Sequence, residues 1–189
     1  MPRGARPAFT LIELVMVMVL IGLMVAISAP RIDIMGYRAN TAIRVLGTTV
    51  LTAQRQALTQ QHNVIVRFDT VNLRLRVHQD RDNDGVVDAG EQLRSVPLGE
   101  SIVFGLGDAP PRGTLSTAIT FTRVSNGDLA VTFHRDGSAS EAGGFYVTSP
   151  RAAAAGSDYP DHSRLVVVER ATGRSASYRY LGGEWRKVY

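Results

Sequence analysis

The most chemically distinctive stretch of the sequence is acidic and covers residues 80–91, "DRDNDGVVDAGE". Its spacing fits the twelve-residue calcium-loop template, in which oxygen ligands surround a tight turn and a glycine gives the backbone the freedom to make it. Gly85 stands at that glycine position. The candidate ligands are Asp80, Asp82, Asp84, the backbone carbonyl of Val86, Asp88 and Glu91.

Two interpretations of this loop stay open. An EF-hand places a helix on each side of its loop, whereas the flanks here, "LRLRVHQ" and "QLRSVPL", have the pattern of strands, so the loop would have to close within a hairpin. Aspartate, asparagine and glycine are also the usual residues of long turns. Five acids within twelve residues repel one another without a cation, so calcium, if bound, would be structural and would order the loop.

A second acid lies in an unusual place near the N-terminus. Residues 9–29, "FTLIELVMVMVLIGLMVAISA", are apolar except for Glu13, the only charged residue among them. About twenty helical residues span the roughly 30 Å of a bilayer core, so we expect this segment to be a transmembrane helix. Arg3 and Arg6 precede it without a nearby acid, which predicts a cytoplasmic N-terminus and an exported C-terminal part.

Three interpretations of this segment compete. It could be a cleaved secretory signal ending in "AISA", a plain signal anchor with Glu13 at the interface, or an anchor kept after removal of a short leader. An unpaired acid costs on the order of 2.5–3.5 kcal/mol near the membrane centre. Cleavage after Ala8 would give Phe9 a free α-ammonium group four residues from Glu13, so only the third interpretation supplies the missing cation.

The stretch "AFTLIELVMVMVLIGLMVAISAP" closely resembles the N-terminus of type IV pilins and of type II secretion pseudopilins. The resemblance implies cleavage between Ala8 and Phe9 by a prepilin peptidase, followed by methylation of the new N-terminus. Ala8 stands where the family usually has glycine. In that family the glutamate, here Glu13, is thought to pair with the N-terminal amine of an adjacent subunit. The implied partners are therefore other pilins in a helical filament, the peptidase and the bacterial inner membrane.

The rest of the sequence predicts an α+β domain. Ala39, Ile43, Leu46, Val50, Ala53 and Ala57 recur at steps of three and four, so we expect one helix to continue to about residue 61. Short β-branched and aromatic segments then predict an antiparallel sheet, at 64–68, 73–79, 118–122, 129–134, 144–149, 164–170 and 177–183. Residues 149–163 have the composition of an exposed loop. The expected organisation is a leader (1–8), an apolar half-helix (9–30) and a globular domain (31–189).

A narrower resemblance covers residues 129–174. The segments "LAVTFHRDGSAS", "GGFYVTS" and "RLVVVERATGR" are similar to the C-terminal part of the GspH/FimT group. This resemblance implies a pilin-like fold and a minor pseudopilin of a type II secretion system, located in the inner membrane with a periplasmic globular domain. The alternative is a FimT/FimU-type minor pilin that acts in type IV pilus assembly or DNA uptake. A membrane-anchored calcium-binding module that never polymerises also stays open.

Nucleic acid is not an expected partner. Related minor pilins implicated in DNA uptake carry Gly-Arg-x-Arg, whereas this sequence has Gly173-Arg174-Ser175-Ala176 and lacks the second arginine. Arg174 and Arg179 are the nearest candidates for DNA contact, but the formal net charge is only +4 and acids are interspersed with these arginines. We expect them to lie on a solvated strand face.

The sequence shows no pattern of a catalytic site. There are no cysteines, which excludes disulfides, thiolate metal sites and a cysteine nucleophile. The four histidines lack metal-ligand spacing, and we expect them to be surface or strand residues: His62, His78, His134 and His162. Phosphate-binding glycine loops and serine nucleophile motifs are also missing from the sequence. A structural, non-enzymatic role without an obligatory cofactor is expected.

Overall fold

The computed structural model describes residues 9–28, 33–154 and 158–188. The chain forms two units, Met1–Ile34 and Met35–Tyr189. The predicted leader and Ala8 lie outside the described residues.

The first unit contains helix α1 (Leu11–Ser28). Its large apolar side chains are exposed on every side, with exposed fractions between 48% at Val15 and 83% at Leu11. A helix that is apolar all round is typical of a segment that other apolar groups cover. In the described parts of the chain, no helix reaches both the length and the apolarity required to cross a membrane.

Helix α2 (Ile34–Gln60), which belongs to the second unit from Met35 onward, confirms the amphipathic pattern. All six residues of the predicted face are buried: Ala39, Ile43, Leu46, Val50, Ala53 and Ala57. The helix ends before Gln61, whose φ of 58° is left-handed and stops helical hydrogen bonding. The sequence predicted one continuous helix from residue 9, whereas Asp33 belongs to neither α1 nor α2 and residues 29–32 lie outside the described ones.

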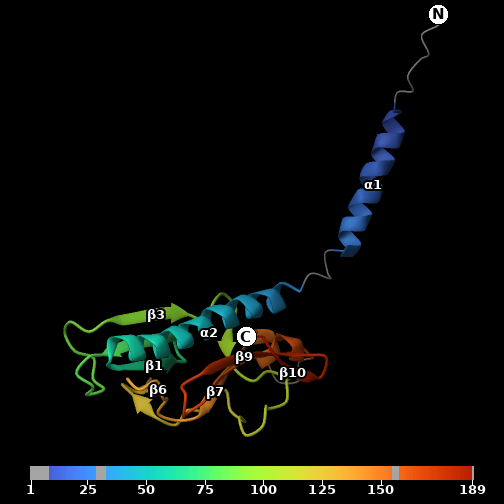
Figure 1. The fold of residues 1–189 in the computed structure, drawn as a ribbon. Helices are drawn as coiled ribbons and strands as arrows, with labels where there is room; N and C mark the ends of the chain where they lie inside the picture. The colour runs from blue at the N-terminus through green and yellow to red at the C-terminus, as the bar shows by residue number, and fades with distance from the viewer. Residues whose placement is uncertain (1–8, 29–32, 155–157, 189) are drawn as a thin grey trace, which may run out of the picture. The chain divides into compact units, whose positions relative to one another are not determined.

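Two five-stranded antiparallel sheets, both within the described residues, complete the α+β fold (Figure 1). The first has the order β3-β2-β1-β6-β5, from β1 (Asn63–Asp69), β2 (Arg74–Asp80), β3 (Leu93–Pro97), β5 (Val124–Ser125) and β6 (Asp128–Phe133). The second has the order β10-β9-β8-β7-β4, from β4 (Val103–Phe104), β7 (Gly143–Thr148), β8 (Arg164–Val168), β9 (Ser175–Leu181) and β10 (Glu184–Lys187).

The core joins α2 to both sheets. Phe68 of β1 and Phe145 of β7 come from different sheets, and their ring centroids lie 5.0 Å apart. Phe121 stacks on Phe68 at 5.2 Å. The apolar face of α2 belongs to the same buried cluster, and Figure 1 shows this helix running along the strands. Burial of one helix face on two sheets therefore forms a single core for this unit.

The prediction of a strand at 118–122 is wrong. Only an isolated bridge forms there, between Ile119 and Phe145. Pairing does not continue beyond this bridge, because the N–H groups of Thr122 and Arg123 donate to the Glu141 carboxylate at 2.9 and 3.0 Å. These donors are therefore unavailable to a strand ladder.

The expected exposed loop at 149–163 is also partly wrong. It contains the short helix α3 (Pro150–Ala153) and the 3₁₀-helix η2 (Pro160–His162), and residues 155–157 lie outside the described ones. The Ser149 hydroxyl caps α3 by accepting from the Ala152 N–H at 3.2 Å. His162 is buried in η2, with its Nδ1 2.8 Å from Ser149 Oγ, so it is neither a surface nor a strand residue.

Candidate functional site

The acidic loop 80–91 connects two neighbouring strands of the first sheet. β2 ends at Asp80 and β3 begins at Leu93, and the two strands pair in antiparallel register from His78–Leu93 to Arg74–Pro97. The flanks are therefore strands, as the sequence predicted. A long hairpin loop, and not a helix–loop–helix unit, holds the acids.

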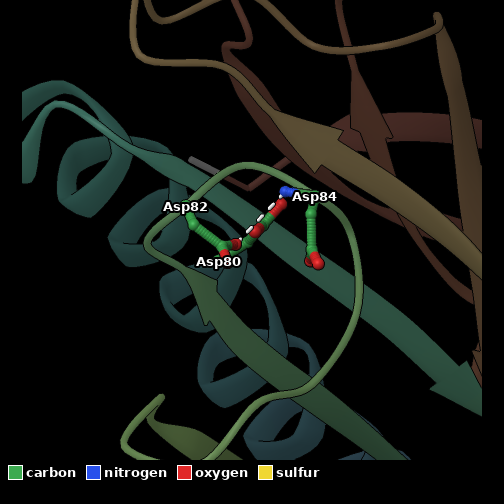
Figure 2. Close-up of side chains that lie close together, drawn as sticks. All are labelled: Asp80, Asp82 and Asp84. Carbon is green, nitrogen blue, oxygen red and sulfur yellow. Dashed lines mark hydrogen bonds between the residues drawn. The ribbon is translucent and has the colours of Figure 1, made fainter.

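Asp80, Asp82 and Asp84 converge inside this loop (Figure 2). Each offers one carboxylate oxygen, and the three oxygens lie within 4.8 Å of one another. Asp82 and Asp84 are exposed, whereas Asp80 is only 1% exposed at the end of β2. The hairpin thus brings together the first three of the predicted ligands.

Local hydrogen bonds fold the loop into this shape. Asp82 Oδ1 accepts from the Asp84 N–H at 3.3 Å, and Asp84 Oδ1 accepts from the Val86 N–H at 2.7 Å, which makes two successive Asx-turns. Gly85 has a φ of 80°, and its N–H donates to Asp80 Oδ2 at 3.1 Å. The left-handed backbone at Gly85 is what lets this N–H face Asp80.

The Asp80 carboxylate is only half satisfied. Its Oδ2 accepts from Gly85, but its Oδ1 is buried and has no hydrogen-bond partner among the described residues. Burial raises the pKa of Asp80, because the charged form loses its hydration. The pKa of Asp88 is raised as well, mainly by the nearby charge of Asp84. The loop therefore gathers several acids at the end of β2, where one oxygen of Asp80 is buried and has no partner among the described residues.

Glu91, the predicted twelfth-position ligand, makes other contacts. Its Oε2 lies 2.6 Å from His78 Nε2 and accepts from the Asp88 N–H at 3.1 Å, while its Oε1 accepts from the Arg81 N–H at 2.7 Å. The bond to His78, followed by those from Asp88 and Arg81, lowers the pKa of Glu91 to about 2. Glu91 therefore closes the loop onto β2, and the three-aspartate cluster within the described residues does not include it.

His78 is the site residue that sequence analysis missed. It is fully buried in β2, thirteen positions before its partner Glu91. The spacing of the histidines does not predict this contact. The hairpin does, because pairing of His78 with Leu93 brings the end of the loop beside the histidine.

Glu13 lies in the first turn of α1. The Thr10 hydroxyl accepts from the Glu13 N–H at 3.3 Å, so Thr10 and Glu13 fit the capping-box pattern at the start of the helix. A carboxylate in the first turn also interacts favourably with the helix dipole. The Thr-x-x-Glu spacing could have predicted this local role. Phe9, on the C-terminal side of the predicted cut, is exposed.

The two candidate DNA-contacting arginines do not lie together. Arg174 is in the turn after β8, and Arg179 is in β9, five residues or about 17 Å of extended chain further on. Arg179 stands opposite Arg186 of β10 and Arg164 of β8. Arg164 is buried, and its Nε donates to Asn40 Oδ1 at 3.0 Å, which makes it part of the packing against α2.

Comparisons with known proteins found structural similarity only. No family model matches the chain, and no curated protein matches it. A structure of the minor pseudopilin EpsH from the type 2 secretion system of Vibrio cholerae is similar, with 14% identity and a TM-score of 0.48, over 78% of this chain and 99% of that one. A crystal structure of the same protein gives 15% identity and a TM-score of 0.46, over 74% and 92% of the respective chains.

Proposed function

We propose that the chain is a minor pseudopilin, a non-enzymatic structural subunit of the periplasmic pseudopilus of a type II secretion system. The observation that carries this proposal is α1, whose apolar side chains are exposed on all sides while a single acid, Glu13, stands in its first turn. Such a surface requires lipid or other apolar helices around it. The sequence resemblance to pilin N-termini covers the same residues.

Before assembly, the apolar run 9–29 would anchor the chain in the inner membrane. The Arg-bearing segment before it would stay in the cytoplasm, and the domain from residue 31 onward would lie in the periplasm. Prepilin peptidase would cut between Ala8 and Phe9 and methylate the new terminus. The cut removes Arg3 and Arg6 and creates an amine at Phe9.

In the filament, Glu13 would pair with the Phe9 amine of a neighbouring subunit. Among packed apolar helices a lone carboxylate is strongly disfavoured, and a paired one is tolerated, so subunits would associate at the stagger that brings the two charges together. The same pairing would serve a FimT/FimU-type minor pilin of a type IV pilus. A DNA-uptake role lacks support from the arginines, since Arg174 and Arg179 are separate and Arg164 is buried.

Two substitutions at Glu13 test the pairing. Glu13→Gln keeps a side chain that suits a capping box, whereas Glu13→Leu removes both the charge and the side-chain acceptor that a capping box uses. Loss of a buried charge pair costs about 3–5 kcal/mol, so both variants should lose more than about a hundredfold in co-purification with the other filament subunits. Thr10→Val, which removes the hydroxyl acceptor but leaves the charge, is the control and should still assemble.

The measurement is made in the native host with the full chain, by shearing or extracting the filament and quantifying the tagged subunit. Membrane retention of each variant is checked in parallel. Wild-type levels of Glu13→Gln in the filament would contradict the charge pairing.

A further inference from the structure

The buried oxygen of Asp80 requires a partner that the described residues do not supply. Asp80 is 1% exposed, and its Oδ1 has no hydrogen-bond donor within the described part of the chain. A buried, unpaired carboxylate oxygen is costly, and such an atom in a native structure calls for an explanation such as a bound ion or an ordered water. None of the three clustered aspartates forms an ion pair within the described residues.

The geometry of the cluster suits a calcium ion. Calcium–oxygen distances are about 2.3–2.6 Å, so two ligands of one ion lie up to roughly 5 Å apart. The oxygens offered by Asp80, Asp82 and Asp84 lie within 4.8 Å of one another, and Figure 2 shows the three side chains together inside the turn. Magnesium requires near-ideal octahedral geometry at about 2.0–2.1 Å, and it usually keeps several waters and binds through only one or two carboxylates.

We propose that the loop 80–91 binds one calcium ion through Asp80, Asp82 and Asp84, with Asp88 and the backbone carbonyl of Val86 as further ligands. This inference goes beyond the role as a filament subunit and does not depend on it. The ion gives the buried Asp80 oxygen its partner and neutralises the acids that face it. Because Asp80 ends β2, the ion ties the loop to the end of this interior strand of the first sheet.

Glu91 has a different role from the twelfth residue of an EF-hand. Its two oxygens already accept from Arg81 and Asp88 and contact His78. We assign it as a positioning residue, which closes the hairpin so that the aspartates converge before the ion binds.

Calorimetric titration of the full chain in a mild detergent, after treatment with EGTA, tests the site with calcium chloride. We expect saturable binding of one ion, with a dissociation constant on the order of 10⁻⁴–10⁻³ M, the range of extracellular calcium modules. Calcium should also raise the thermal unfolding midpoint, by mass action on the folded state, and magnesium chloride at the same concentration should raise it less.

Asp82→Asn and Asp84→Asn each keep a side-chain oxygen that can accept in the Asx-turn, and they remove the charge. Both residues are exposed, so both variants should fold, as circular dichroism would check, and should bind calcium at least about tenfold more weakly. Asp136→Asn is the matched control. Asp136 accepts from the Ser138 N–H at 2.9 Å in the same type of turn outside the cluster, and its substitution should leave calcium binding unchanged.

Three results would overturn the assignment. One is the absence of saturable calcium binding in the wild-type chain up to about 10 mM, roughly ten times the weak end of the expected range. Another is wild-type affinity in both Asp82→Asn and Asp84→Asn. The third is wild-type calcium affinity in a folded Glu91→Gln variant, because Glu91 would then not position the aspartates.

Discussion

Asp69 is a buried acid whose charged form is held by several contacts within the fold. It is buried at the end of β1 and accepts from the Asn72 N–H at 2.8 Å, from the Asn72 side chain and from Arg76, whose Nη2 lies 2.6 Å from Oδ2. The backbone bond from Asn72, with the Arg76 and Asn72 side chains, lowers the pKa of Asp69 well below its usual range, although burial opposes this. These contacts fix the β1–β2 turn.

Asp69 should therefore contribute to stability in a pH-dependent way. A carboxyl group whose pKa is lower in the folded state stabilises the fold above its unfolded pKa of about 3.9, and this contribution is lost as the pH falls toward the folded value. We expect Asp69→Asn to lower the urea midpoint at pH 7 and to make the midpoint depend less steeply on pH below about 4. Urea unfolding from pH 7 to pH 2 measures both effects.

The exposed residue Asp158 provides the control for this series. Asp158→Asn should leave the urea midpoint and its pH dependence close to those of the wild-type chain. An Asp69→Asn variant as acid-sensitive as the wild type would show that the contacts of Asp69 do not control the acid response.

Among the elements, the turn between β8 and β9 depends on close packing. Gly173 has a φ of 60°, and a Cβ atom there would overlap the carbonyl oxygen of Gly137. Gln54 of α2 donates to the neighbouring Thr172 carbonyl at 2.7 Å. Helix α2, the β8–β9 turn and the turn at 135–138 therefore meet at this point. The glycine is required for both its conformation and its small size.

Gly173→Ala should therefore destabilise the domain more than a substitution that strains the backbone alone. Gly127 also has a positive φ, 83°, but a Cβ atom there would meet nothing within 4 Å. Gly127→Ala should cost about 1–2 kcal/mol for the left-handed conformation. Gly173→Ala should cost about 1–3 kcal/mol more because of overpacking. Equal urea midpoints for the two variants would contradict this packing.

Periodicity predicted the main elements well, because each buries one continuous face. The six-residue face of α2 is wholly buried, and most predicted strands form. The segment 118–122 failed because Glu141 takes the N–H groups of Thr122 and Arg123, a long-range contact that no local pattern reveals. The two-residue strands β4 and β5 are too short to carry an alternating pattern.

At the scale of the whole molecule, the sequence predicts which site residues lie together only where their contacts join residues that are close in the sequence. The three aspartates converge because Asx-turns and Gly85 act over a few residues. The contact between His78 and Glu91 depends on strand register, so the sequence alone assigned Glu91 to the metal. The intersubunit role of Glu13 requires a second chain, and it stays a prediction.

The central claim is that cleavage before Phe9 creates the cation that Glu13 requires. Mass spectrometry of the N-terminal peptide, from the protein purified from its native host, tests it most directly. We predict that the mature chain begins at Phe9 and carries a methyl group on its α-amine. A chain that is intact at Met1, or one trimmed beyond residue 29, would contradict the claim.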